Sequence, residues 1–258
     1  MSIIGSCRVI ERDRGMTNKV ILGALILIYT LGICCGCNSQ DKVNSIADIS
    51  YDNDALEHEI YILENDQYVP YIVISNNYNG SVLLLRKEVL STPRSVSEYS
   101  SLYPDSEIDN YLNTEYLTTL CEIQDKILNT ELQVTTEDSL GISGDQIETI
   151  TRKVFLLSCT EVNINSENMA VEGKTLEYFK DSNNRVAYND GVATSWWLRT
   201  PNTYYVSCVY VIGGNSKVGS TNAYDKNGVR PAFCVSASTQ VELRNDIIKG
   251  KSVYLLVV

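Results

Sequence analysis

Two short motifs in the last third of the chain constrain its fold more than any other part of the sequence. Residues 195–201 read SWWLRTP and residues 228–233 read GVRPAF, which together hold both tryptophans, two of the five prolines and two arginines in apolar surroundings. Large aromatic side chains dominate the energetics of protein cores, and proline fixes the backbone where a strand ends. We therefore expect one specified core around a structural motif of Trp196, Trp197, Arg199, Pro201, Gly228, Arg230 and Pro231.

The two arginines of these motifs allow two interpretations. In the first, Arg199 and Arg230 bridge strand ends by binding backbone carbonyls or carboxylates. In the second, one of them offers its bidentate fork to an anionic ligand beside an aromatic face. A guanidinium in apolar surroundings has to be paired already, so we favour the structural interpretation.

The N-terminal region predicts export. An uncharged apolar run of residues 20–33 (VILGALILIYTLGI) follows Lys19 and is too short for a membrane-spanning helix, which needs about 20 residues. Residues 1–15 include acidic side chains and do not fit the start of a signal peptide, so we expect translation to begin at Met16.

The end of the apolar run resembles the lipobox of bacterial lipoproteins, in which a small residue precedes a lipid-modified cysteine. Gly36 and Cys37 fit that step best, with Cys37 as the lipid-attachment residue. Cys34 would restore Leu31 three positions earlier, and Cys35 lies between the two. An uncleaved anchor and ordinary secretion are the alternatives to a lipid anchor on the outer face of the bacterial cell membrane.

Charge and composition limit the partners and suggest the domain plan. The net charge of −11, without a cluster of Lys and Arg, argues against a nucleic-acid partner. Residues 38–57 are polar and weakly periodic, so we expect a flexible tether between the signal region, residues 1–37, and a single domain, residues 58–258. The only expected membrane contact is through the N-terminal lipid or anchor.

Local patterns predict an α+β fold whose C-terminal third is rich in strands. Ser106 and Asp109 form a capping signal ahead of helically spaced apolar residues, so residues 106–121 should be helical, with a further helical turn in residues 171–180. Asn and Gly between two apolar runs indicate a hairpin of residues 71–75 and 81–85. The remaining expected strands are residues 152–158, 196–199, 205–212, 217–219, 229–235 and 253–258.

Four cysteines lie beyond the signal region: Cys121, Cys159, Cys208 and Cys234. In an exported protein an even number allows disulfides, in any of three connectivities. Cys159, Cys208 and Cys234 lie in apolar, strand-like runs where cysteine often serves as a small buried side chain. Disulfides and buried free thiols are therefore both open.

Most catalytic and metal-binding patterns are absent from the sequence, although its many carboxylates leave a two-acid glycosidase open. His58 is the only histidine, which argues against a Ser-His-Asp arrangement or a histidine-rich metal site. The glycine-rich, zinc-protease and nucleophile-elbow motifs do not occur either. We expect neither a cofactor nor a metal, and no enzymatic activity.

The order and spacing of four motifs resemble those of a protein family called domain of unknown function 6273. They are SEIDNYLN (106–113), VFLLS (154–158) followed by Glu161, WWLRTP (196–201) and GVRPAF (228–233). The resemblance spans roughly residues 61–235 and implies a C-type-lectin-like fold of mixed and antiparallel sheets with one or two helices. Formylglycine-generating enzymes share that fold and use two cysteines near its C-terminal part, but the residues around Cys208 and Cys234 do not match theirs.

The loops between the two tryptophan-arginine motifs are the best candidate for a ligand-binding face. Exposed Tyr, Asn and Ser side chains held by strands make adaptable polar contacts at low entropic cost, although Gly and Asn are also what simple turns require. The candidate residues are Asn202, Tyr204, Tyr205, Asn215, Tyr224, Asp225 and Asn227.

The function we expect is that of a binding or scaffolding module at the cell surface, with a glycan or a surface protein as ligand. A degenerate enzyme of the formylglycine-generating type and a purely structural envelope protein are the alternatives.

Overall fold

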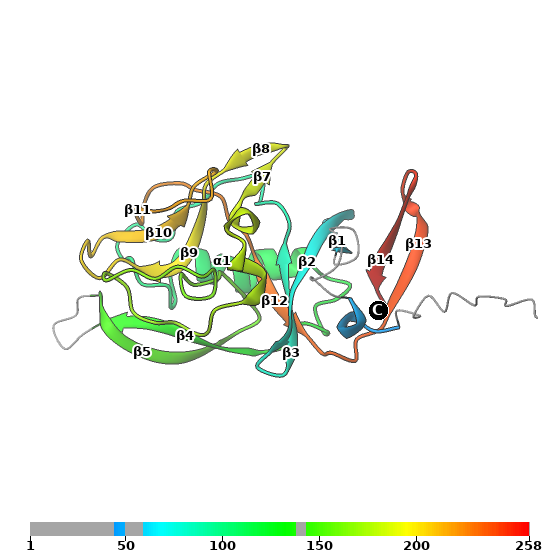
Figure 1. Cartoon of the computed structure of the whole chain (residues 1–258), viewed down its shortest axis with the longest axis horizontal. Helices are drawn as coiled ribbons and strands as arrows, with labels where there is room; N and C mark the ends of the chain where they lie inside the picture. Colours follow the sequence, from blue (N-terminus) through cyan, green and yellow to red (C-terminus); the bar gives the residue numbers. More distant parts are fainter. Residues whose placement is uncertain (1–43, 50–58, 138–142, 258) are drawn as a thin grey trace, which may run out of the picture. The chain divides into compact units, whose positions relative to one another are not determined.

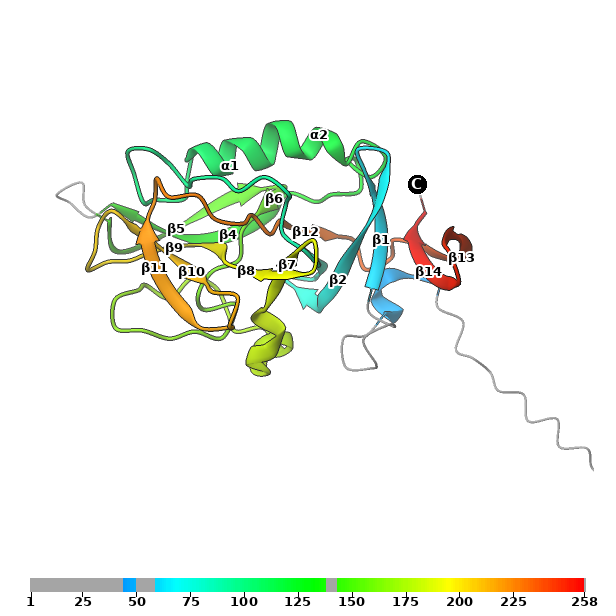
Figure 2. The same cartoon turned by 90° about the horizontal axis from the view of Figure 1, so that it is seen from above.

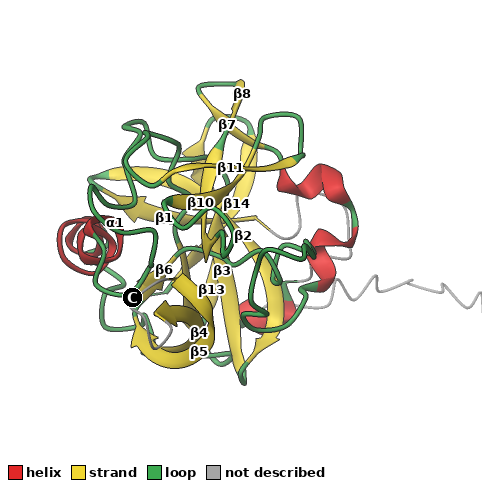
Figure 3. Cartoon of the chain, turned by 90° about the vertical axis from the view of Figure 1, so that its left-hand side faces the viewer, coloured by secondary structure: helices red, strands yellow, loops and turns green. Residues whose placement is uncertain are grey.

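The computed structural model describes residues 44–49, 59–137 and 143–257, and these form a mostly antiparallel α+β fold (Figures 1 and 3). The apolar run of residues 20–33 and Cys37 lie outside the described residues. Among the residues that are described, none of the helices is both long enough and apolar enough to cross a bilayer.

Seven strands make the largest sheet, in the order β13-β14-β1-β2-β3-β12-β6. All neighbouring strands pair antiparallel except β1 and β14, which are parallel. The strands are β1 (Glu59–Glu64), β2 (Gln67–Tyr78), β3 (Ser81–Arg86), β6 (Val154–Phe155), β12 (Ala232–Val235), β13 (Val241–Ile248) and β14 (Lys251–Leu256).

Three smaller sheets complete the fold. One has the order β11-β10-β9 and carries the first tryptophan-arginine motif, and the other two are the hairpins β4-β5 and β7-β8. Their strands are β4 (Thr130–Glu137), β5 (Ser143–Arg152), β7 (Ala187–Asn189), β8 (Val192–Thr194), β9 (Trp196–Pro201), β10 (Cys208–Ile212) and β11 (Val218–Asn222).

The predicted helix is present and lies beside β6 (Figure 2). It consists of α1 (Glu107–Tyr111), a π-helical turn (Leu112–Tyr116) and α2 (Leu117–Thr119). The Ser106 side chain accepts a hydrogen bond from the Asp109 amide at 3.3 Å, which is the predicted N-cap. Ile108, Leu112 and Leu120 are buried in the core, as the apolar spacing predicted.

Other short elements follow the sequence pattern closely. The hairpin β2-β3 turns at Asn79 and Gly80, whose φ angles of 51° and 86° are the left-handed values that these residue types tolerate. A 3-10 turn (Glu177–Lys180) lies within the region expected to be helical, and a second one (Ser182–Arg185) follows it.

Several predicted strands were wrong in extent. The strand expected at residues 152–158 is divided in the structure: Arg152 ends β5 and pairs with Thr130, and Val154–Phe155 forms β6. The carbonyl oxygens of residues 156–157 bind Arg199 instead of a neighbouring strand. The strand expected from Tyr205 begins at Cys208, since residues 203–207 form a turn, and β12 begins at Ala232 rather than at residue 229.

Part of the segment expected to be a polar tether packs against the domain. A 3-10 turn (Ile46–Asp48) buries Ile46 completely and Ile49 to 1% exposure, and Ser45 bridges to Gln240. Two isolated apolar side chains have no periodicity to reveal them, so the sequence pattern missed this contact. Residues 38–43 and 50–57 lie outside the described residues.

Candidate functional site

The tryptophan-arginine motif lies at the centre of the fold. Trp196 and Trp197 are both completely buried, and their indole N–H groups donate to the carbonyl oxygens of Arg185 and Arg94 at 2.8 and 2.7 Å. Gly228 pairs with this strand so closely that a Cβ atom would lie 2.6 Å from the Ser195 carbonyl oxygen. Only glycine fits at that position, so the two motifs are joined through their backbones.

Arg199 forms the core of a buried ion cluster. Its Nη1 and Nη2 atoms donate to both carboxylate oxygens of Glu161, at 2.7 and 2.9 Å, and its Nε lies 3.7 Å from Glu172. The carbonyl oxygens of Leu156 and Gln133 accept its remaining hydrogen bonds, at 2.8 and 3.2 Å. All three charged side chains of this Arg199 cluster are completely shielded from solvent.

The two carboxylates of the Arg199 cluster are held by several donors. Glu172 accepts from the Thr135 amide and hydroxyl and from the Thr200 hydroxyl, each at 2.7 Å. Burial nevertheless raises the pKa of Glu172. Desolvation destabilises the charged form of the carboxyl group, and this effect is larger than the stabilisation that Arg199 and the threonine donors provide. Burial is the largest single effect on Arg199 and lowers its pKa, but the attraction and hydrogen bonds of Glu161 together with the attraction of Tyr78 and Glu172 exceed it, so the pKa of Arg199 is raised and the side chain stays charged.

Tyr78 connects the Arg199 cluster to the surface. Its hydroxyl donates to Glu161 at 2.6 Å, and its ring stacks on Phe155 at a centroid distance of 6.1 Å. Burial, together with the negative charge of Glu161, raises the pKa of Tyr78, so the phenol keeps its proton and acts as the donor in this bond.

Arg230 is also buried, but its contacts differ from those of Arg199. Its Nε donates to the Arg86 carbonyl oxygen at 2.9 Å and its guanidinium lies 5.2 Å from the Trp196 ring centre. Within residues 44–49, 59–137 and 143–257 no carboxylate pairs with it, and its Nη1 atom has no hydrogen-bond partner. Burial lowers the pKa of Arg230 to about 10. The expectation that a buried arginine is already paired therefore holds for Arg199 and only in part for Arg230.

Comparison with known families shows to which family this chain belongs. A domain of unknown function, DUF6273, matches residues 79–237, which is more than half of the chain. The chain belongs to this family. No curated protein and no solved structure matches it.

The DUF6273 region contains every motif that carried the resemblance, and their side chains bind one another. Asp109 on the helix is 1% exposed and receives two hydrogen bonds from Arg152 Nε, at 2.8 and 2.9 Å. Asn113 donates to the Val154 carbonyl oxygen and accepts from the Val154 amide, so it fixes the helix to β6. Together with the Glu161–Arg199 pair, these contacts make the motifs the frame of the domain.

The candidate ligand loops lie on the surface of the DUF6273 region, and most of them gather at one end of the hairpin β10-β11. The loop of residues 203–207 and the turn of residues 223–227 are joined by a hydrogen bond from the Ala223 amide to the Ser207 carbonyl oxygen. Tyr204, Tyr205 and Tyr224 are 69, 59 and 58% exposed. The rings of Tyr204 and Tyr205 meet edge to face, with centroids 4.8 Å apart.

A third loop, which the sequence did not single out, joins this surface. The Val96 and Ser97 amides both donate to the Ala223 carbonyl oxygen, and the Ser101 hydroxyl donates to the Val206 carbonyl oxygen. This loop carries Tyr99, which is 87% exposed. We call the exposed residues Tyr99, Tyr204, Tyr205, Val206 and Tyr224 the tyrosine surface.

Four other candidate residues have different positions. Asn202 is buried, and its side-chain oxygen accepts from the amides of Tyr204 and Tyr205, so it shapes the loop from below. Asp225 and Asn227 are half-buried and bind the hydroxyls of Thr221 and Ser195. Asn215 lies in the turn at the opposite end of the hairpin, beyond Ile212 and Val218, so it is not part of the tyrosine surface.

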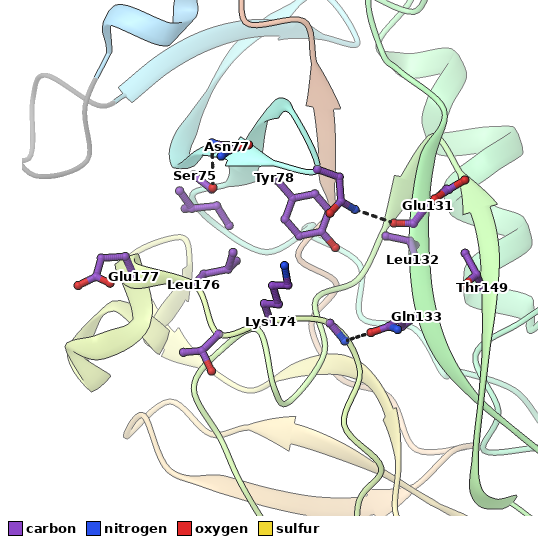
Figure 4. Close-up of a pocket in the computed structure, with 14 residues that line it drawn as sticks. Ser75, Asn77, Tyr78, Glu131, Leu132, Gln133, Thr149, Lys174, Leu176 and Glu177 are labelled. Carbon is purple, nitrogen blue, oxygen red and sulfur yellow. Dashed lines mark hydrogen bonds between the residues drawn. The ribbon is translucent and has the colours of Figure 1, made fainter.

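The structure also has a pocket that the sequence analysis missed, with a volume of about 540 Å³ (Figure 4). Tyr78 lines it, together with the end of β2, parts of β4 and β5, and the loop that follows Glu172. These segments are far apart in the sequence and hold ordinary polar residues. Contacts between distant segments bring them together, such as those of Tyr78 with Glu161, Asn79 with Glu131 and Gly173 with Gln133. No local signal could therefore have predicted this Tyr78 pocket.

All four cysteines among the described residues are free thiols, which decides between the two open expectations. Cys159 and Cys234 are completely buried, and burial raises the pKa of both thiols, that of Cys234 to about 12. Cys121 is exposed. In the part of the chain that the structure describes, His, Cys, Asp and Glu side chains do not gather in threes as a metal site would need.

Alkylation of the native protein should follow this burial. With iodoacetamide at pH 8, we expect modification of Cys121 and none of Cys159 or Cys234, because the thiolate is the nucleophile and buried thiols form it poorly. Peptide mass spectrometry gives the modified positions, and the protein unfolded in guanidinium provides the control in which all should react. Rapid native labelling of Cys234 would contradict the buried position of β12.

Proposed function

We propose that this protein is an exported, lipid-anchored binding module of the cell surface, and that it recognises a protein partner through the tyrosine surface. The support for export is the apolar run after Lys19 that ends at Gly36 and Cys37. The support for binding is the gathering of four exposed tyrosines on loops that a frame of strands holds in place.

Exposed tyrosines on rigid loops suit protein recognition for physical reasons. Each ring offers a large contact area with few rotatable bonds, so little entropy is lost when it is fixed in a complex. Aromatic residues are enriched in protein–protein interfaces relative to the rest of the surface, whereas Lys and Glu are depleted there. Val206, which is 50% exposed beside Tyr205, adds apolar area to the same surface.

A glycan ligand on this surface is the nearest competing outcome. Sugars also stack on aromatic rings, but the edge-to-face pair of Tyr204 and Tyr205 offers no flat platform of two parallel rings. A C-type-lectin-like fold belongs to the same proposal, and its support is the motif resemblance together with antiparallel sheets and a single packed helix.

The enzyme alternative receives less support from the cysteines. A catalytic thiol has to be reachable and readily ionised. Cys208 lies on β10 in the three-stranded sheet, whereas Cys234 lies on β12 in the seven-stranded sheet and is completely buried. A purely structural envelope role differs from recognition in predicting no partner at the tyrosine surface.

The tyrosine surface can be tested with the double variant Tyr204→Ser/Tyr205→Ser. On an array of exported proteins and glycans, we expect the full chain to bind a protein and the variant to lose at least about tenfold in affinity, as for aromatic residues at the centre of an interface. The variant should melt at the temperature of the wild type, because both side chains are exposed.

The matched control is Tyr188→Ser, which removes a tyrosine that is 45% exposed on β7, outside the tyrosine surface. It should bind like the wild type. Binding to a glycan alone would identify the competing ligand class, and equal loss in both variants would refute a specific role for the tyrosine surface.

Export and anchoring have their own measurement. Mass spectrometry of the mature protein from bacterial membranes should show an N-terminus at a diacylglyceryl-modified Cys37. Replacement of Cys37 by Ser should release the protein from the membrane or leave its signal peptide uncleaved. An unmodified N-terminus that begins at Met1 or Met16 would refute the lipid anchor.

A further inference from the structure

The Tyr78 pocket has the size and position of a ligand site but lies apart from the tyrosine surface. Its volume of about 540 Å³ falls within the range of about 300–1,000 Å³ that is usual for small-molecule sites. Its walls come from four segments: residues at the end of β2 with the turn residue Asn79, residues 131–133 of β4, Thr149 of β5, and residues 173–177, which lead to the start of the 3-10 turn. The tyrosine surface shares no residue with it.

The wall of this pocket offers hydrogen-bonding groups that the protein itself leaves unused. The Gln133 side-chain oxygen accepts from the Gly173 amide at 2.9 Å, which leaves its NH₂ group available to a ligand. The Asn77 side-chain oxygen accepts from the Gly80 amide at 3.2 Å, and its NH₂ group has no bond among the described residues. The Tyr78 hydroxyl donates a hydrogen bond to Glu161, so its oxygen can still accept one from a ligand hydroxyl.

Lys174 supplies the positive charge of the Tyr78 pocket. Its side chain reaches from the loop toward Tyr78 in the middle of the pocket (Figure 4). Within residues 44–49, 59–137 and 143–257, no carboxylate forms an ion pair with it. The side chains of Glu131 and Glu177 also line the pocket, but both point away from Lys174 in the same view.

The pocket is also held rigid. The hydrogen bond to Glu161 fixes Tyr78 to the Arg199 cluster. The loop that carries Lys174 is fixed at Gly173, which has a φ of 81° and donates its amide hydrogen bond to Gln133. A Cβ atom at Gly173 would lie 3.0 Å from Glu161, so the loop and the cluster are in direct contact. A site that is ordered before binding loses little entropy on binding.

We propose that the Tyr78 pocket binds a small acidic saccharide, whose carboxylate pairs with Lys174 and whose hydroxyls bind Gln133, Asn77 and Tyr78. Neutral donors and acceptors around a single cation match a ligand that is rich in hydroxyls and carries one negative charge. A purely apolar ligand would leave these polar groups unpaired, which costs binding free energy.

The test uses two pairs of sugars that differ only in a carboxylate: glucuronate with glucose, and galacturonate with galactose. Titrations of the full chain, followed by calorimetry or ligand NMR, should show saturable binding of at least one uronate and at least about tenfold weaker binding of its neutral counterpart. Lys174→Ala should weaken uronate binding about tenfold or more, and Lys174→Arg should retain most of it.

Two controls separate this site from the rest of the protein. Lys217→Ala removes an exposed lysine in the turn of the hairpin β10-β11, and Tyr204→Ser/Tyr205→Ser alters the tyrosine surface, so both should bind the uronate like the wild type. The proposal is overturned if neither uronate binds, if sugar and uronate bind equally, or if Lys174→Ala and Lys217→Ala behave alike. None of these outcomes affects the protein partner of the tyrosine surface, which the array tests separately.

Discussion

Arg199→Met should unfold the domain or lower its melting temperature steeply. The substitution keeps an unbranched apolar side chain in place of the arginine stem but leaves Glu161 and Glu172 buried without their cation. Breaking a buried ion pair in this way costs about 3–5 kcal/mol. For a domain of this size that corresponds to a fall of about 6–20 °C in melting temperature. Thermal unfolding followed by circular dichroism measures this change in melting temperature.

Arg244→Met is the matched control. Arg244 also contacts two carboxylates, those of Asp246 and Glu242, but its side chain is 41% exposed on β13. Water screens such a pair, so its loss should change the melting temperature little. Similar effects of the two substitutions would mean that the Arg199 cluster is not the buried, ion-paired centre described above.

The same cluster explains how far the sequence could predict this fold. A tryptophan pair, two arginines and prolines in apolar surroundings predicted a central core, and Trp196, Trp197, Arg199 and Arg230 are indeed at most 1% exposed. The helix cap at Ser106 and the turn at Asn79 and Gly80 were predictable because each depends on neighbouring residues only.

Contacts between distant segments were not predictable in this way. Glu172 has no sequence signal that assigns it to Arg199, because it reaches Thr135 and Thr200 from a loop without regular structure. The hairpin β4-β5 was missed because β4 has only two apolar side chains, Leu132 and Val134, and the described side chains of β5 are mostly polar and at least partly exposed. The candidate binding loops were named in one group, although the hairpin β10-β11 separates Asn215 from Tyr224.

The frame and the two candidate sites are physically connected. Glu161 binds Arg199 on one side and Tyr78 on the other, so the core motif positions the floor of the Tyr78 pocket. On the tyrosine surface, Asn202 follows directly after Pro201 at the end of the same strand and fixes the amides of Tyr204 and Tyr205. Sequence changes in the loops can therefore alter which ligand is bound without disturbing the motif that holds the loops.

Arg230→Ala should destabilise the domain by several kcal/mol. The side chain is 1% exposed, so truncation leaves a cavity beside Trp196 and removes the donor to the Arg86 carbonyl oxygen. Truncating a large buried side chain to alanine costs about 2–5 kcal/mol. Chemical denaturation would measure the loss as a lower midpoint with an unchanged slope.

Arg230→Met should be far milder than Arg230→Ala, and milder than Arg199→Met. Methionine fills most of the space of the arginine stem, and it removes a charge that burial disfavours, as the pKa of about 10 for Arg230 shows. No buried carboxylate among the described residues is left unpaired by this change, whereas Arg199→Met leaves two. The same substitution thus separates an arginine held by charge from one held by packing. Equal losses at the two positions would mean that Arg230 also depends on an acidic partner.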